Sequence, residues 1–205
     1  MDNRFGAWSA ATAAAASLCY AVSQVLQVVG FLPDPWDRIL IFAPSLALAP
    51  AFVLALGAAH VTCAPNRQQW SLAALVLGIL YAADVSQVYV VQLGAVIPSE
   101  MAGDGRTVAW AACCRWHMPA TAIDLLGYTF MSFSTLLLAP AFPGNGLRRQ
   151  LRWALIANGL LGPIIFAELA WHWLLYVAAA WLVTFPAAMI LLARVFTANT
   201  TLPER

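Results

Sequence analysis

Residues 39–62 read ILIFAPSLALAPAFVLALGAAHVT, a stretch without a single Asp, Glu, Lys or Arg. About 18 or more consecutive apolar residues are enough for a helix to cross the hydrocarbon core of a bilayer. This stretch therefore predicts a transmembrane helix. The fold of the chain then depends on how often the same pattern recurs on either side of it.

The pattern recurs along most of the chain, and the breaks between the apolar stretches carry clusters of proline, glycine and asparagine that end helices. The one long connection covers residues 98–119, where residues 107–116 could form a short helix at the membrane surface. The sequence therefore predicts an all-α protein with a single domain, residues 1–205, folded as a polytopic membrane bundle of about six transmembrane helices. We expect the spans at about residues 7–32, 39–62, 70–97, 120–142, 151–171 and 173–196.

The composition agrees with a membrane protein and excludes several functions. Of the 205 residues, 62% are hydrophobic and 9% are charged, whereas soluble domains carry about 25% charged residues. All 10 basic residues are arginines, so chemistry through a lysine Schiff base is excluded. The net charge of +1 argues against a nucleic-acid partner.

The arginines predict the orientation of the bundle. If the N-terminus lies inside, the cytoplasmic side carries Arg4, Arg67, Arg148, Arg149, Arg152, Arg194 and Arg205, and the outer side carries Arg38, Arg106 and Arg115. Cytoplasmic loops of membrane proteins are richer in arginine than outer loops. We therefore expect a multi-pass protein with both termini in the cytoplasm and the long connection outside.

Three carboxylates fall inside the predicted spans: Asp84, Asp124 and Glu168. An ionisable side chain within a bilayer is costly, and such residues usually mark a functional site. In the predicted orientation all three lie between the midplane and the outer surface. We therefore take them as candidate catalytic residues, with Asp84 and Asp124 as an acid–base pair and Glu168 as the third member.

Polar and aromatic side chains fall at the same depth as these acids, mostly at spacings of three, four or seven residues, which place them on common helical faces. One of them is the only tryptophan that lies far from a predicted span end. We expect these residues to line a cavity with a polar floor and aromatic walls in the outer half of the bundle. The expected substrate-binding set is Tyr20, Gln24, Gln27, Tyr81, Gln87, Tyr128, His172 and Trp181.

Each of these signals also has a structural interpretation. A single buried acid can pair with a neighbour for packing specificity, and a glutamine face can hold helices together by hydrogen bonds. Cys113 and Cys114 are expected to be ordinary thiols rather than a strained vicinal disulfide. Glu168, His172 and His117 could meet at a metal ion, but their spacing matches no zinc motif. We therefore assign no metal and no cofactor.

Four stretches together resemble a family of small six-span bacterial integral membrane proteins. They are QVLQVVGFLPDPWD at residues 24–37, VQLGAVIP at 91–98, IDLLGYTFMS at 123–132 and LIANGLLGP at 155–163. The resemblance covers most of the chain. It implies a six-helix protein of the bacterial inner (cytoplasmic) membrane, and it brings no activity with it.

The size, the intramembrane acids and the aromatic content are also similar to those of membrane-bound terpene cyclases of the fungal meroterpenoid type. This is an analogy of function without a shared motif, so no residue is carried over. A carboxylic acid in an apolar pocket can keep its proton at neutral pH and donate it, while a second carboxylate acts as base. Aromatic faces stabilise positive charge in a dry site.

These features favour a membrane enzyme that uses acid–base chemistry on a lipophilic small molecule, such as the cyclisation or isomerisation of an isoprenoid or polyene. Two other functions stay open. The same acids could form a proton relay in a small transporter or channel. The glutamine face could instead bind membrane lipids or a partner helix in a non-catalytic module. The sequence does not set the oligomeric state.

Overall fold

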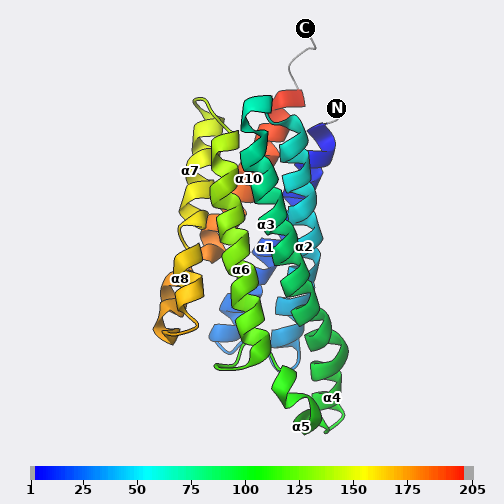
Figure 1. Cartoon of the computed structure of the whole chain (residues 1–205). Coiled ribbons are helices and arrows are strands. Elements are labelled where there is room, and N and C mark those ends of the chain that lie inside the picture. The colour runs from blue at the N-terminus through cyan, green and yellow to red at the C-terminus, as the bar shows by residue number, and fades with distance from the viewer. Residues whose placement is uncertain (1–2, 201–205) are drawn as a thin grey trace.

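The computed structural model describes residues 3–200 of the chain, and their side chains as far as residue 198. These residues form helices joined by turns, and no β-strand occurs among them. Figure 1 shows a single elongated bundle in which the first and last described residues lie at the same end. We call the opposite half of the bundle the far half.

The predicted all-α membrane bundle is confirmed. Six segments are long and apolar enough to cross a membrane: Asn3–Val28, Trp36–Thr62, Pro65–Met101, Pro119–Ala141, Leu147–Ala167 and His172–Ala198. The helices are α1 (Asn3–Val28), α2 (Trp36–Thr62), α3 (Gln68–Val91), α4 (Ile97–Met101), α5 (Gly105–Val108), α6 (Pro119–Leu138), α7 (Leu147–Gly159), α8 (Gly162–Ala167), α9 (Leu175–Ala178) and α10 (Trp181–Thr200). Short η turns lie at Pro65–Arg67, Gln92–Val96, Ala109–Ala111, Ala139–Ala141 and His172–Leu174.

Small residues let the helices approach one another closely, as is common in membrane bundles. Gly127 on α6 faces α3, where an added Cβ would lie 2.8 Å from Val85 Cγ1. Gly159 on α7 faces α6, where an added Cβ would lie 2.9 Å from the Cα of Leu136. The two glycines therefore hold α6 tightly between α3 and α7, and α6 carries Asp124.

The fifth and sixth spans are both interrupted. The fifth span consists of α7 and α8, with a turn at residues 160–161 that precedes Gly162 and Pro163. Proline has no N–H to donate to the preceding turn, which explains the break. The sixth span begins with a short turn and α9, and continues in α10. Glu168 is the first residue of the tight connection between these two spans.

The long third connection differs from its predicted form. Its helical part comprises α5 and the turn Ala109–Ala111, so residues 107–116 do not form one helix. The Gln92 side chain binds the backbone at Ala111 and Cys113 instead. Cys114 then adopts a left-handed conformation with φ of 65°, which a regular helix cannot contain.

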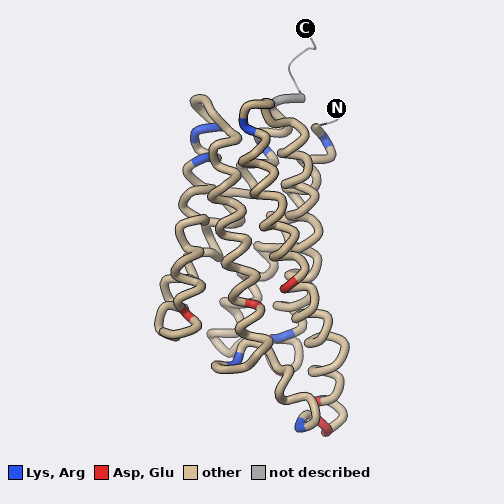
Figure 2. The backbone as a smooth tube through the Cα atoms, viewed as in Figure 1, with Lys and Arg blue, Asp and Glu red and all other residues tan. Residues whose placement is uncertain are grey.

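The charges are distributed unevenly along the bundle. Figure 2 shows basic residues at both ends, whereas acidic residues are drawn only from the middle of the bundle to its far end. Asp84 and Asp124 lie within spans of the structure, whereas Glu168 follows the end of the fifth span at Ala167. The structure supports a multi-pass membrane protein, and which side of the membrane the termini occupy stays a prediction.

Candidate functional site

Aromatic rings from several helices meet in the interior of the bundle. The Tyr128 ring on α6 makes edge-to-face contacts with Tyr81 on α3, at 5.9 Å between centroids, and with Trp181 on α10, at 5.0 Å. Tyr20 on α1 makes a similar contact with Trp181 at 5.6 Å. Tyr81, Tyr128 and Trp181 are buried. Four of the residues expected from the sequence to contact a substrate are therefore brought together, and we call them the aromatic cluster.

Asp124 lies beside this aromatic cluster, one helical turn before Tyr128. Tyr89 on α3 is close enough to Asp124 to interact with its carboxylate electrostatically, and its hydroxyl donates to the Tyr128 hydroxyl at 2.9 Å. Buried Tyr89 was not among the expected site residues. It follows Tyr81 by eight residues on the same face of α3, so the helical period contained the signal.

Several polar atoms here lack a hydrogen-bond partner among the described residues. They are Asp124 Oδ1, Tyr81 Oη and Trp181 Nε1, and all three are buried. Because most buried polar atoms in proteins are paired, each exception needs a physical explanation. Three unpaired polar atoms therefore lie within or beside the aromatic cluster.

A series of hydrogen bonds runs along α1 from the aromatic cluster to the far end. The Tyr20 hydroxyl donates to Gln24 Oε1 at 3.1 Å, and Gln24 Nε2 donates to Gln27 Oε1 at 3.0 Å. Gln27 Nε2 then donates to Asp37 Oδ2 on α2 at 3.2 Å. This glutamine face therefore joins α1 to α2, and it also fixes the orientation of the Tyr20 hydroxyl.

Two cysteines of the third connection lie against Asp124. Gln92, in the π turn after α3, accepts the Cys113 N–H at 2.9 Å and donates to the Ala111 carbonyl at 2.8 Å. The left-handed conformation of Cys114 brings the two Sγ atoms within 2.8 Å of each other. The neighbouring Cys114 thiol and burial both raise the pKa of the Cys113 thiol. This contact has no signal in the local sequence, because it depends on how the connection folds back.

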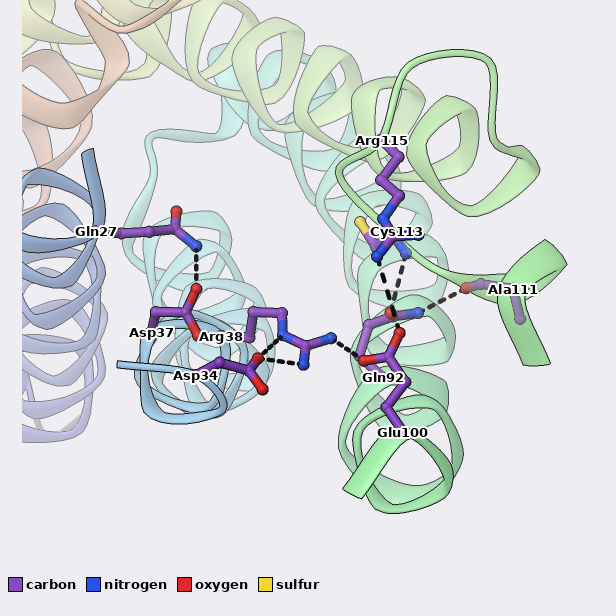
Figure 3. A network of polar contacts seen from close by, with 9 residues as sticks. All are labelled: Gln27, Asp34, Asp37, Arg38, Gln92, Glu100, Ala111, Cys113 and Arg115. Carbon is purple, nitrogen blue, oxygen red and sulfur yellow. Dashed lines mark hydrogen bonds and ion pairs between the residues drawn. The ribbon is translucent and has the colours of Figure 1, made fainter. Parts of the chain in front are cut away.

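A cavity of about 350 Å³ lies at the far end of the bundle, next to Cys113. Figure 3 shows its charged residues, with Arg38 directed at both Asp34 and Glu100. Arg115 lies 3.9 Å from Glu100 on the other side. The charges around the cavity are therefore paired with one another. Cys113 lines the same cavity.

Glu168 lies to the other side of Asp124, at the turn after α8. Its side chain is buried, with 6% of the residue exposed, and it is close enough to Asp124 to act on it electrostatically. Burial raises the pKa of Glu168, and His172 partly opposes this shift. His172 itself is exposed, and its ring packs on Trp116 at 4.6 Å.

Asp84 and Gln87 occupy a different position. Asp84 is partly exposed at the contact between α3 and α6, where an added Cβ on Gly127 would lie 3.3 Å from Asp84 Cβ. Its Oδ2 atom is buried without a partner among residues 3–198. Gln87 is exposed and donates to the Ala83 carbonyl of its own helix. The described contacts do not join Gln87 to the aromatic cluster.

Comparison with protein-family models, with curated proteins and with solved structures finds no match. The function is therefore inferred from the chemistry of the described residues. Their main feature is a carboxylate that sits between tyrosines on one side and two thiols on the other.

Proposed function

We propose that this chain is an integral membrane enzyme that performs acid–base chemistry on a lipophilic small molecule. Cyclisation or isomerisation of an isoprenoid or polyene is the reaction class that suits the site. The observation that carries the proposal is Asp124 itself, whose Oδ1 atom is buried and unpaired among the described residues and which lies one helical turn before Tyr128 of the aromatic cluster. We place the enzyme in the bacterial cytoplasmic membrane, with both termini in the cytoplasm.

The chemistry would begin with protonation of a carbon–carbon double bond. Asp124 donates its proton to one alkene carbon, which forms a new C–H bond and leaves a positive charge on the neighbouring carbon. The faces of Tyr81, Tyr128 and Trp181 stabilise that charge in a site without bulk water. Loss of a proton from an adjacent carbon then gives the isomer, or attack by a second double bond closes a ring before the proton is lost. No oxidant or reductant is required.

The proton acceptor would be one of the other two candidate acids. Glu168 is supported by its burial and by its electrostatic proximity to Asp124. Asp84 is supported by its place beside Gly127, one turn along α6 from Asp124. Turnover measured for Glu168→Gln and for Asp84→Asn separately would identify which of the two accepts the proton.

A proton-coupled transporter has less support, because it needs a polar path through the half of the bundle that holds the termini. There the buried groups bind one another: Asn158 Nδ2 donates to Thr135 at 3.0 Å, and Thr184 donates to Asn158 Oδ1 at 2.9 Å. Acidic side chains are absent from that half within the described part of the chain. A binding module without activity would use the unpaired Asp124 oxygen to hold a ligand and would form no labelled product in D₂O.

The test uses deuterium as a reporter of protonation at carbon. Purified protein in lipid nanodiscs is incubated in D₂O with isoprenoids and polyenes extracted from the host membrane, and products are separated and weighed by mass spectrometry. We expect a product of unchanged formula that carries one deuterium on carbon, and we expect Asp124→Asn to abolish it.

Asp34→Asn is the matched control, because it removes an exposed carboxylate outside the aromatic cluster. It should leave the labelled product unchanged. Absence of a labelled product throughout the panel, or equal labelling by Asp124→Asn, would rule out the proposed reaction class.

A further inference from the structure

The thiols of Cys113 and Cys114 and the carboxylate of Asp124 form a group of potential metal ligands. One ligand atom from each residue lies within 4.8 Å of the other two. Among the described residues, it is the one group of three or more His, Cys, Asp or Glu side chains whose ligand atoms lie this close together. The Asp124 Oδ1 atom is buried and has no partner there. A carboxylate with an unpaired oxygen thus lies beside two neighbouring thiols.

The donor atoms fit a particular class of ion. Thiolates favour soft or borderline ions such as Zn²⁺ over Mg²⁺ or Ca²⁺, and a carboxylate oxygen is a common third zinc ligand. With Zn–S bonds of about 2.3 Å and Zn–O bonds of about 2.1 Å, tetrahedral ligand atoms lie roughly 3.6–3.8 Å apart. The two Sγ atoms are 2.8 Å apart and would need to separate by about 1 Å.

The surrounding structure allows an ion to enter and holds the ligands in place. Cys113 lines the cavity of about 350 Å³ at the far end, and Cys114 is exposed. Gln92 accepts the Cys113 N–H and donates to the Ala111 carbonyl, as Figure 3 shows. These two hydrogen bonds hold the backbone that carries Cys113.

We propose that Cys113, Cys114 and Asp124 bind one zinc-class divalent cation beside the cavity that Cys113 lines, and that the bound ion inhibits the enzyme. Binding replaces the protons of the two thiols and of the Asp124 carboxyl group, so that Zn²⁺, two Cys–SH groups and one Asp–COOH group give a zinc dithiolate carboxylate and three released protons. A carboxylate that holds the ion cannot deliver a proton to a substrate. The inhibition rests on the proposed function, whereas the binding does not.

The experiment measures binding without any substrate. The full-length protein, with Cys19 and Cys63 changed to serine and with a phosphine reductant present, is titrated with Cd²⁺ and followed through the ultraviolet thiolate-to-cadmium band. Zn²⁺ affinity is then measured by competition. Because Cys19 and Cys63 lie outside the ligand group, this background should bind one ion per chain.

Three variants in this background define the site. Changes outside the ligand shell alone lower metal affinity by about 10–100-fold, so loss of a ligand through Cys114→Ser or Asp124→Asn should lower Zn²⁺ affinity by at least about 100-fold. Asp84→Asn is the matched control and should bind normally. Cys114 is exposed, so its variant is expected to fold even if a Cys113 variant does not.

Two results would overturn the site: no binding to the parent protein, or binding that survives Cys114→Ser. Binding that is lost in Cys114→Ser and unchanged in Asp124→Asn would overturn the third ligand and the inhibition. A protein that binds zinc through all three residues and yields no labelled product in D₂O would refute the proposed reaction and leave the metal site standing.

Discussion

Replacing Gln92 with leucine should release the connection that carries Cys113 and Cys114. Gln92 is 2% exposed and makes two buried hydrogen bonds, to the Cys113 N–H and to the Ala111 carbonyl. A neutral hydrogen bond contributes about 0.5–1.5 kcal/mol net, and more is lost when a buried backbone group stays unpaired. We therefore expect a loss of about 2–3 kcal/mol. For a chain of this size that corresponds to a decrease in Tm of about 4–12 °C.

The assay is thermal unfolding in detergent micelles together with the rate of maleimide modification at Cys113, with the other cysteines changed to serine. Gln87→Leu is the matched control, since Gln87 is exposed on the preceding helix and bonds only within that helix. Its Tm should change by no more than the equivalent of about 0.5 kcal/mol. If Gln92→Leu unfolds and reacts like Gln87→Leu, Gln92 does not hold the connection and the site loses its support.

Three further predictions follow from the packing and the charges. Gly159→Ala should destabilise the protein by about 1–3 kcal/mol in thermal unfolding, because the added Cβ would meet the Leu136 backbone. Gly57→Ala is the control and should be neutral or stabilising, because no atom lies within 4 Å of its added Cβ. Equal effects of the two substitutions would refute the close contact between α6 and α7. Tyr89→Phe removes the hydroxyl that donates to Tyr128 near Asp124 and should lower the rate at which the deuterium-labelled product forms. Tyr176 is exposed, so Tyr176→Phe is the control and should leave that rate unchanged. An unchanged rate in Tyr89→Phe would remove Tyr89 from the site. A reporter fused after residue 205 should be active only in the cytoplasm, and a periplasmic signal would invert the orientation predicted from the arginines.

The number and position of the spans could be predicted from the sequence because they follow from local hydrophobicity, which each stretch carries independently of its neighbours. The ends of the spans in the structure differ from the predicted ends by a few residues. The third span, for example, continues through the π turn at Gln92–Val96 to Met101. That extension depends on contacts with the folded connection, which hydropathy does not report.

The candidate site could be predicted in part. Helical spacing places Tyr20, Tyr81 and Tyr128 on interior faces, and the structure brings their rings to Trp181 directly or through Tyr128. The same spacing does not determine rotation about the helix axis to within one side chain. Gln87 follows Tyr81 by six residues, which turns its side chain about 240° around the helix axis at 3.6 residues per turn. Its side chain is exposed, whereas that of Tyr81 is buried.

The contact of Cys113 and Cys114 with Asp124 could not be predicted, because it arises from tertiary structure. It requires the left-handed conformation at Cys114 and the hydrogen bonds from Gln92, which lies 21 residues before Cys113. Neither feature has a signature in the local sequence. The local sequence accordingly predicts ordinary thiols at both positions.

The central claim is that Asp124 serves proton transfer rather than packing, and Asp124→Asn tests it most directly. The substitution keeps the shape of the side chain and removes its exchangeable acid proton. Turnover of the deuterium-labelled product and Tm should be measured on the same purified variant. We predict that turnover falls by at least about 10²-fold while Tm is unchanged or higher, since an amide is less costly to bury than a carboxylate. Unchanged turnover together with a loss of about 1–3 kcal/mol in stability would contradict the claim and make Asp124 a structural residue.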